Sequence, residues 1–283
     1  MRDSLRFRAV RAVVLVFLLL FVLLPVYIAV SSALKPLAEV SGGAFHWLPS
    51  TLSFDALTHA WSDLDLGPAF TNSLVVTIVA TIVLVPLAVC AAFALSRYVF
   101  AGRRIFLVTM LSTQVFPGIF FLIPLYLIYI RIQALLGIPL VGSWTGLIIT
   151  YVSFSLPLSI WIMTGYFSEI PRDLEEAAAI DGLSEIGAFV RVVLPTSVGT
   201  IASVAIFASI TSWSELLFAS VLTTGPSQTL PVALSGVTAS PGSVIHWNEL
   251  MAAAIFASIP TLAAFYLVRR YFVAGLLSGA VKG

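Results

Sequence analysis

Charged residues divide this chain into long uncharged stretches, most of them apolar. Because about 20 apolar residues cross the roughly 30 Å of hydrocarbon in a bilayer, such a stretch can hold a transmembrane helix. Six helices are predicted, near residues 12–32, 70–96, 105–130, 144–168, 196–222 and 250–272. From residue 223 to 248 we expect an external loop instead, because glycines and prolines interrupt the pattern.

The composition agrees with an all-α integral membrane protein. Sixty per cent of the residues are hydrophobic and ten per cent are charged, whereas about a quarter of the residues in soluble domains are charged. The net charge of +1 argues against a nucleic-acid surface. Cys90 is the only cysteine, which excludes a disulfide framework, and we predict that it is a small packing residue.

The positions of Lys and Arg predict the orientation in the membrane. With the N-terminus inside, twelve of the fourteen basic residues, from Arg2 to Lys282, lie on the cytoplasmic side. Only Lys35 and Arg131 then fall outside. We therefore expect both termini in the cytoplasm, an N-terminal helix with its external loop over 1–69, and a transmembrane core over 70–283.

The cytoplasmic segment 169–195, between the fourth and fifth helices, is predicted to form a helix, a tight turn and a second helix. Pro171 suits the first turn of a helix, and three acidic residues that follow it complement the positive helix end. Gly182 fits the left-handed position that ends a helix. Ser184 can cap the second helix, which Pro195 is expected to limit.

Two interpretations of this segment follow from the residues alone. It can be an amphipathic connector that rests on the headgroups, or a projection that fits a groove on another protein. Its acidic first helix is poorly suited to an anionic leaflet, which attracts Lys and Arg. The pattern favours docking to a protein without naming that protein.

The same segment resembles a motif of binding-protein-dependent ABC importer permeases. That motif has Glu-Ala-Ala, a Gly shortly after, and Leu-Pro about a dozen residues later. The matching residues here are Glu176, Ala177, Ala178, Asp181, Gly182, Phe189, Leu194 and Pro195. Val192 stands where the family usually has Ile. The resemblance implies a coupling helix that sits in a cleft of an ATPase subunit.

Shorter motifs resemble the carbohydrate branch of this family, and its maltose-type second permease in particular. They are Ser32 to Pro36, Asn72-Ser73, Ile123 to Tyr126, Gly146 to Ile148, Phe167 to Pro171 and Ser278 to Gly283. The resemblance implies a multi-pass subunit of the bacterial inner membrane that imports a sugar or oligosaccharide. It also implies a second, different permease, two ATPase subunits and an external sugar-binding protein as partners. Another cargo, such as a glycerophosphodiester, stays open.

The chain itself has no phosphate-binding loop. Such a loop needs Gly-Lys before Ser or Thr, and neither Lys35 nor Lys282 follows a glycine. We therefore expect no catalytic residue, cofactor or metal in this chain, and ATP with Mg²⁺ bound by the partner subunits.

Glu215 is the acidic residue that falls within a predicted span, beside Trp213. It is either a gate residue that faces the translocation pathway or a carboxylate that reaches the external interface or a partner. A sugar pathway would use aromatic faces and neutral hydrogen-bonding groups. The further candidates are Asn72, Gln114, Tyr151, Ser155, Trp161 and Trp213. For Tyr151 and Trp161, packing within the bundle is the alternative.

Two rival functions are an ion-coupled secondary transporter and a membrane-embedded enzyme. The first would need an inverted repeat and buried acid or His relays, and neither is visible. The second would need clustered catalytic residues at a membrane interface. His46, His59 and His246 all fall in external segments without a catalytic or metal-ligand spacing.

Overall fold

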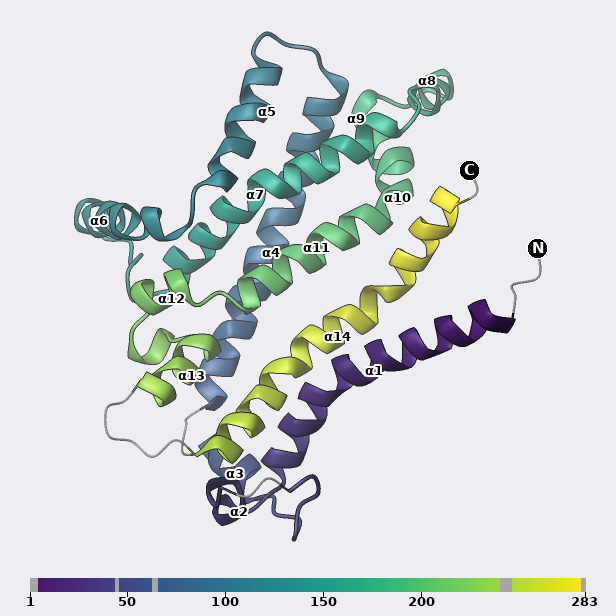
Figure 1. The fold of residues 1–283 in the computed structure, drawn as a ribbon. Coiled ribbons are helices and arrows are strands. Elements are labelled where there is room, and N and C mark those ends of the chain that lie inside the picture. The colour runs from purple at the N-terminus through teal and green to yellow at the C-terminus, as the bar shows by residue number, and fades with distance from the viewer. Residues whose placement is uncertain (1–4, 44–45, 63–65, 240–245, 281–283) are drawn as a thin grey trace. The chain divides into compact units, whose positions relative to one another are not determined.

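The computed structural model describes residues 5–43, 46–62, 66–239 and 246–280, with side chains described for 7–237 and 246–269 within these ranges. Every regular element in them is a helix, as predicted (Figure 1). Arg2, Lys282 and the end of the 278–283 motif lie outside the described residues. The chain divides into two compact units, Met1–Gly67 with Ala233–Ile259 and Pro68–Val232 with Pro260–Gly283.

The first unit contains α1 (Leu5–Ala33), α2 (Leu37–Ser41), α3 (Asp55–Ser62) and the start of α14 (Trp247–Ala280). The most apolar stretch of α1 is not buried at all within this chain. Near its end, the buried Lys35 ammonium donates to the His46 carbonyl, and Trp61 packs edge-on against Phe256 at 5.3 Å. The α3 helix is thus tied to α14, and the apolar surface of α1 is left uncovered by the described chain.

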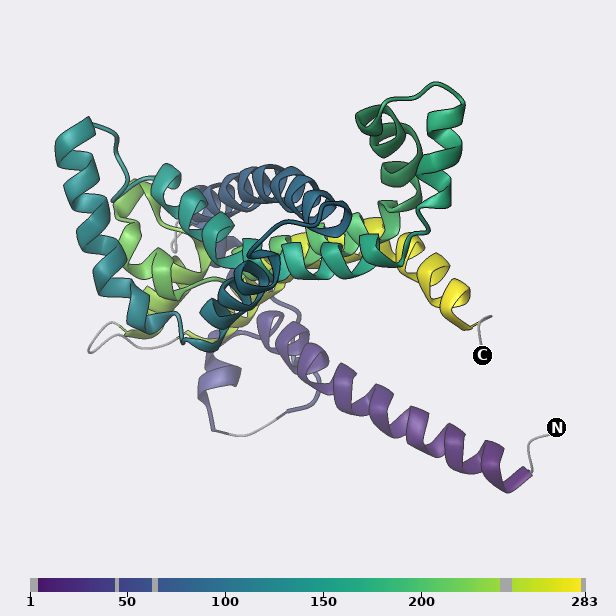
Figure 2. The ribbon, with the colours of Figure 1, turned by 90° about the horizontal axis from the view of Figure 1, so that it is seen from above.

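The second unit is organised around α4 (Leu66–Arg97), α7 (Trp144–Glu169) and α11 (Val198–Trp213) (Figures 1 and 2). One face of α4 is buried at every fourth residue, as the spacing of a helix requires. These positions are Val76, Ala80, Leu84, Ala88 and Ala92. Three of the five are alanines, which let neighbouring helix backbones approach closely.

At the start of α7 the chain allows no side chain at one position. A Cβ built on Gly146 would lie 1.9 Å from the Leu140 carbonyl oxygen. Gly146 is therefore required by close approach of the backbone, which explains a glycine inside an apolar helix.

Four predicted helices are confirmed as helices, with 12–32 inside α1, 70–96 inside α4, 144–168 inside α7 and 250–272 inside α14. The predicted helix over 196–222 is interrupted, because α11 ends at Trp213 and the chain becomes helical again only at Leu217. Among the described residues, five helices are long and apolar enough to cross a membrane, or six if one bent pair is counted as a span. The orientation in the membrane stays a prediction.

The predicted helix over 105–130 is wrong, because the structure breaks it in two. α5 (Arg103–Ser112) is followed by a 3-10 turn, and α6 (Ile119–Leu136) runs in a different direction (Figure 1). Pro117 causes the break, because it forces the preceding Phe116 into an extended conformation with ψ of 127°. Hydropathy does not detect such a break, since both halves are apolar.

The predicted loop over 223–248 is also partly wrong. It contains a 3-10 turn, Gly225–Ser227, and α13 (Leu230–Ala239). The Leu230 N–H donates to Ser73 Oγ at 2.7 Å, and Pro231 falls in the first turn, where its missing N–H costs no helical bond. The Leu230 side chain is buried. Tertiary contact thus overrides the glycine and proline pattern.

Cys90, predicted to be a packing residue, is exposed on α4 in this chain.

Candidate functional site

The 169–195 segment forms the predicted helix and turn. α8 (Asp173–Ile180) ends in a Schellman motif, in which the Leu183 N–H donates to the Ala178 carbonyl and the Gly182 N–H donates to the Ala179 carbonyl, both at 3.0 Å. Gly182 has a φ of +85°, a conformation that side chains strain. The turn therefore depends on this glycine, as predicted.

The second helix begins as predicted, and the first begins slightly later than expected. Ser184 Oγ accepts from the Gly187 N–H at 3.2 Å and caps α9 (Glu185–Ala188). α8 starts at Asp173, so Pro171 lies two residues before the first helical residue rather than in the first turn.

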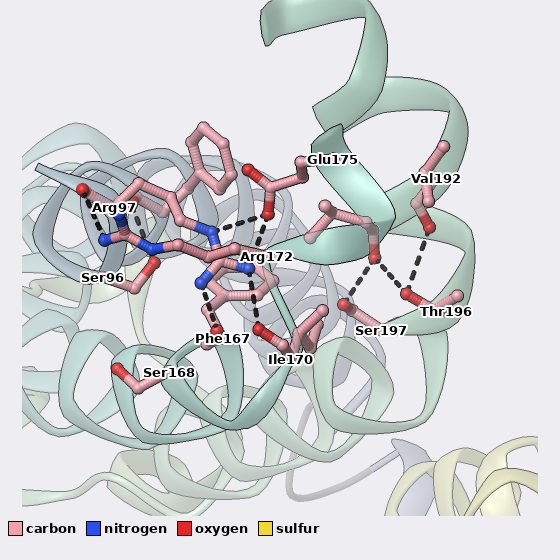
Figure 3. Close-up of polar contacts among 12 residues, drawn as sticks. Ser96, Arg97, Phe167, Ser168, Ile170, Arg172, Glu175, Val192, Thr196 and Ser197 are labelled. Carbon is pink, nitrogen blue, oxygen red and sulfur yellow. Dashed lines mark hydrogen bonds and ion pairs between the residues drawn. The ribbon is translucent and has the colours of Figure 1, made fainter. Parts of the chain in front are cut away.

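The helix that begins with α9 ends at Thr196, so the prediction that Pro195 limits it is confirmed to within one residue. The chain stays helical through the π turn Phe189–Val193 and α10 (Leu194–Thr196), then bends by 74° into α11. A proline ring presses on the carbonyl four residues earlier, and the wide π turn relieves this crowding. The Val193 carbonyl is taken by the hydroxyls of Thr196 and Ser197, at 2.8 and 2.6 Å (Figure 3).

The outward face of this segment carries apolar side chains that the rest of the described chain leaves uncovered. Ile180, Ile186 and Val190 are 88%, 75% and 51% exposed, and a Cβ on Gly182 would meet nothing within 4 Å. Glu176, Ala177 and Asp181 are exposed as well, whereas Ala178 is buried. Figure 2 shows α8 to α10 projecting as a compact knob beyond the ends of α7 and α11. Such a knob presents a surface for another protein.

Arg97, the last residue of α4, ties this segment to two helices (Figure 3). Its Nε and Nη2 each lie 2.6 Å from Glu175 Oε1 on α8. Its Nη1 donates to the Phe167 carbonyl at 2.8 Å and its Nη2 to the Ile170 carbonyl at 3.3 Å, where α7 ends. Arg172 donates back to the Arg97 carbonyl at 3.1 Å.

Tyr98 makes a second tie to the segment. Its hydroxyl donates to Glu185 Oε2 at 2.7 Å, at the start of α9. The hydrogen bond to the Glu185 carboxylate, with its negative charge, raises the pKa of Tyr98 above that of an ordinary tyrosine. Neither tie was predicted from the sequence, because each joins residues that lie far apart in the chain.

Glu215 lies at the break between α11 and α12 (Leu217–Leu222). Its two carboxylate oxygens accept from the N–H groups of Phe218 and Ala219, at 2.8 and 3.0 Å. Oε2 also accepts from the Tyr151 hydroxyl on α7 at 3.0 Å. The carboxylate thus satisfies the free N–H groups at the start of α12, which is a structural role that the sequence did not suggest.

The other predicted pathway residues are distributed over the second unit. The Asn72 amide donates to the carbonyls of Pro226 and Gln228, at 2.8 and 2.7 Å. Gln114 donates to the Phe154 carbonyl at 3.0 Å, and Trp213 packs edge-on against Phe70 at 5.5 Å.

Trp161 lines a cavity. The cavity, of about 540 Å³, is also lined by Thr164, Ser168 and Thr200. Ser155 is half-buried on α7. A hydrogen bond joins two of the seven candidates, Tyr151 and Glu215, and Asn72, Gln114 and Trp213 contact other residues. The place of all seven in a pathway stays a prediction.

Comparison with known proteins identifies the family of this chain. Residues 84–278 match the family of binding-protein-dependent transport system inner membrane components. The chain belongs to this family. The trehalose transport system permease protein SugB of Mycobacterium tuberculosis is 36% identical over 264 residues, covering 93% of each chain. The diacetylchitobiose uptake permease DasC of Streptomyces coelicolor is 33% identical over 284 residues, covering both chains completely.

Other relatives extend the comparison. The alpha-glucoside permease AglG of Rhizobium meliloti is 32% identical over 237 residues, which cover 83% of this chain and 62% of the relative. A permease chain in the crystal structure of a bacterial ABC transporter that imports alginate has a TM-score of 0.79 at 23% identity, covering 96% of this chain and 99% of that one. This likeness confirms the ABC permease fold. The present permease is thus a multi-pass inner-membrane transport component rather than an enzyme.

Proposed function

We propose that this permease is one of two different transmembrane subunits of an ATP-driven sugar importer, and that the 169–195 segment receives the motion of an ATPase subunit. The exposed apolar knob formed by α8, Gly182 and α9 carries the proposal. On the predicted cytoplasmic side, docking on another protein would remove the exposed Ile180 and Ile186 from water.

The docking residues proposed are those of the family motif, from Glu176 to Gly182 with Leu194 and Pro195. The exposed Ala177 adds little bulk to α8, and the fixed turn at Gly182 presents α9 beside it. Two ATPase subunits bind ATP and Mg²⁺ in this proposal, because this chain lacks a phosphate-binding loop. An external sugar-binding protein delivers the cargo.

A sugar cargo is supported by the relatives, whose names specify trehalose, diacetylchitobiose and alpha-glucosides. The maltose-type motifs of the sequence agree with this class. The pathway candidates, Glu215 among them, remain proposals for cargo contact, and the partner permease can carry most of the contacts. A glycerophosphodiester is the alternative cargo.

Copurification with the neighbouring subunits tests the proposal. We expect the tagged permease to bring down an ATPase, a second permease and a binding protein. In proteoliposomes, trehalose, maltose or diacetylchitobiose with the binding protein should stimulate ATP hydrolysis, and glycerophosphocholine should not. Stimulation by glycerophosphocholine alone would overturn the sugar assignment.

Variants test the docking surface. Glu176→Lys and Gly182→Trp should abolish stimulated hydrolysis while the subunit still inserts, because each alters the exposed face of the knob. Arg104→Glu, which reverses an exposed charge at the start of α5, is the matched control. Stimulated activity that survives in both knob variants would contradict the coupling role.

A further inference from the structure

The two helices of the 169–195 segment are each fastened to one of two adjacent residues, Arg97 at the end of α4 and Tyr98 directly after it. Arg97 holds α8 through Glu175, and Tyr98 holds α9 through Glu185. The partners are 78 and 87 residues apart in sequence, so these contacts are tertiary rather than local. We call Arg97 and Tyr98, with their carboxylate partners, the α4 clamp.

Polar ties rather than packing hold α8 against the end of α4. A cavity of about 260 Å³ lies between them, lined by Phe93, Arg97, Tyr98, Glu175, Ala179 and Glu185. Side chains do not fill this space, so dispersion contacts there are few. The Arg97 side chain is only 8% exposed and that of Glu175 21%, so their ion pair is screened far less than a surface pair.

The π turn of the segment is held by aromatic packing, whereas α8 and α9 are held by polar contacts. Phe189, in the π turn, lies 4.1 Å from Phe93 of α4 and 6.3 Å from Phe167 of α7, ring centre to ring centre. The aromatic trio fixes a pivot, and the α4 clamp prevents rotation of α8 and α9 about it.

We propose that the α4 clamp makes the 169–195 segment and α4 move as one body, so that Arg97 is the positioning residue through which a stroke of the ATPase reaches α4. This inference rests on the proposed function, because it requires an ATPase docked on the segment. Without the clamp, the segment would follow the ATPase by turning at its pivot while α4 stays behind. Tyr98 contributes less than Arg97, because it makes one bond to an exposed carboxylate.

Spin-label distances in the complete transporter test the clamp. Labels at Asp173→Cys on α8 and Ile82→Cys on α4 are introduced after Cys90→Ala, and both sites are exposed. Ile82 lies about 22 Å along the helix axis from Arg97, at 1.5 Å per residue, which suits the method. Distances are recorded in lipid without nucleotide and with ATP and vanadate.

In the labelled parent, the distance between the two labels should be the same in both nucleotide states. In Arg97→Gln it should match the parent without nucleotide and shift or broaden with ATP and vanadate. Arg97→Lys should restore part of the parent behaviour, since an ammonium can still pair with Glu175. Arg104→Gln, which removes an exposed charge nearby, should behave as the parent.

Three results would overturn the inference. They are a parent distance that already changes with nucleotide, an Arg97→Gln distance that does not change, and an Arg97→Gln distance altered equally in both states, which marks a purely structural role. Copurification separates the two proposals. If the ATPase is absent from the parent complex, the proposed function fails. If the ATPase is retained and the label distance in Arg97→Gln does not change with nucleotide, only the clamp is refuted.

Discussion

Two carboxylates, Glu175 and Glu215, each lie at the start of a helix, but they accept from different donors. Glu175 pairs with a charged side chain, whereas Glu215 accepts mainly from backbone N–H groups. Glu175 accepts from Arg97, a cation on another helix. Glu215 accepts from N–H groups three and four residues ahead of it, at Phe218 and Ala219, and from the hydroxyl of Tyr151. The first carboxylate joins distant elements, and the second ends one helix and starts the next.

The difference shows what each charge can do. The Glu215 site is built mostly from its own neighbourhood, so its removal should weaken one local break. The Glu175 site joins α8 to α4 and to the end of α7 through one guanidinium, so loss of that guanidinium should weaken contacts among three elements. Four measurements test this difference.

The largest effect is expected for Arg97→Met. Loss of the guanidinium leaves Glu175 without its cation and removes the side-chain donor from the carbonyls of Phe167 and Ile170, which should cost about 2–4 kcal/mol of unfolding free energy. Unfolding in detergent, followed by circular dichroism, measures it. Arg104→Met should change stability by less than about 0.5 kcal/mol. Equal losses in the two variants would remove the special status of Arg97.

Glu215→Ala should cost less, about 2 kcal/mol, because it uncovers two backbone N–H groups and one phenol. The same unfolding assay applies. Glu215→Gln should recover part of the loss, since its amide oxygen still accepts one bond. Ser214→Ala removes only a hydroxyl bonded within its own helix, to Ile210, and serves as the control. A Glu215→Ala variant of unchanged stability would return this carboxylate to the pathway interpretation.

Gly182→Ala tests whether the turn that ends α8 requires a glycine. The expected cost is about 1–2 kcal/mol, because φ of +85° strains any side chain although the space there is open. Gly165→Ala, in the ordinary helix α7 and with equally open space, should instead be neutral or stabilise by up to about 1 kcal/mol. Changes of the same sign at both glycines would contradict the assignment of the turn.

The smallest effect is expected at Tyr98. Because its folded pKa is raised, the bond to Glu185 contributes below the ordinary tyrosine pKa of about 10 and is lost as pH rises through the raised value. The ultraviolet titration of the parent minus that of Tyr98→Phe should show a late-ionising phenol. In Glu185→Gln this ionisation should move to lower pH; an unmoved titration would show that the carboxylate is not its partner.

The sequence predicts local chemistry well and tertiary chemistry poorly. Gly182 and Ser184 act through backbone groups within four residues, so their roles follow from residue type and spacing. The break at Pro117 and the cap by Glu215 lie within apolar runs, where hydropathy cannot separate one helix from two. The Arg97 contacts needed the fold, because nothing local distinguishes this arginine from its neighbours.

Exposed Cys90 gives this transporter a built-in chemical reporter. It is the only thiol of the chain and lies seven residues before Arg97 on α4, about two helical turns away. Its alkylation rate by small maleimides, measured in native vesicles through a transport cycle, therefore follows the surroundings of the helix that carries Arg97 without any engineered cysteine. If the surroundings of α4 change during the transport cycle, the alkylation rate of Cys90 should change with them.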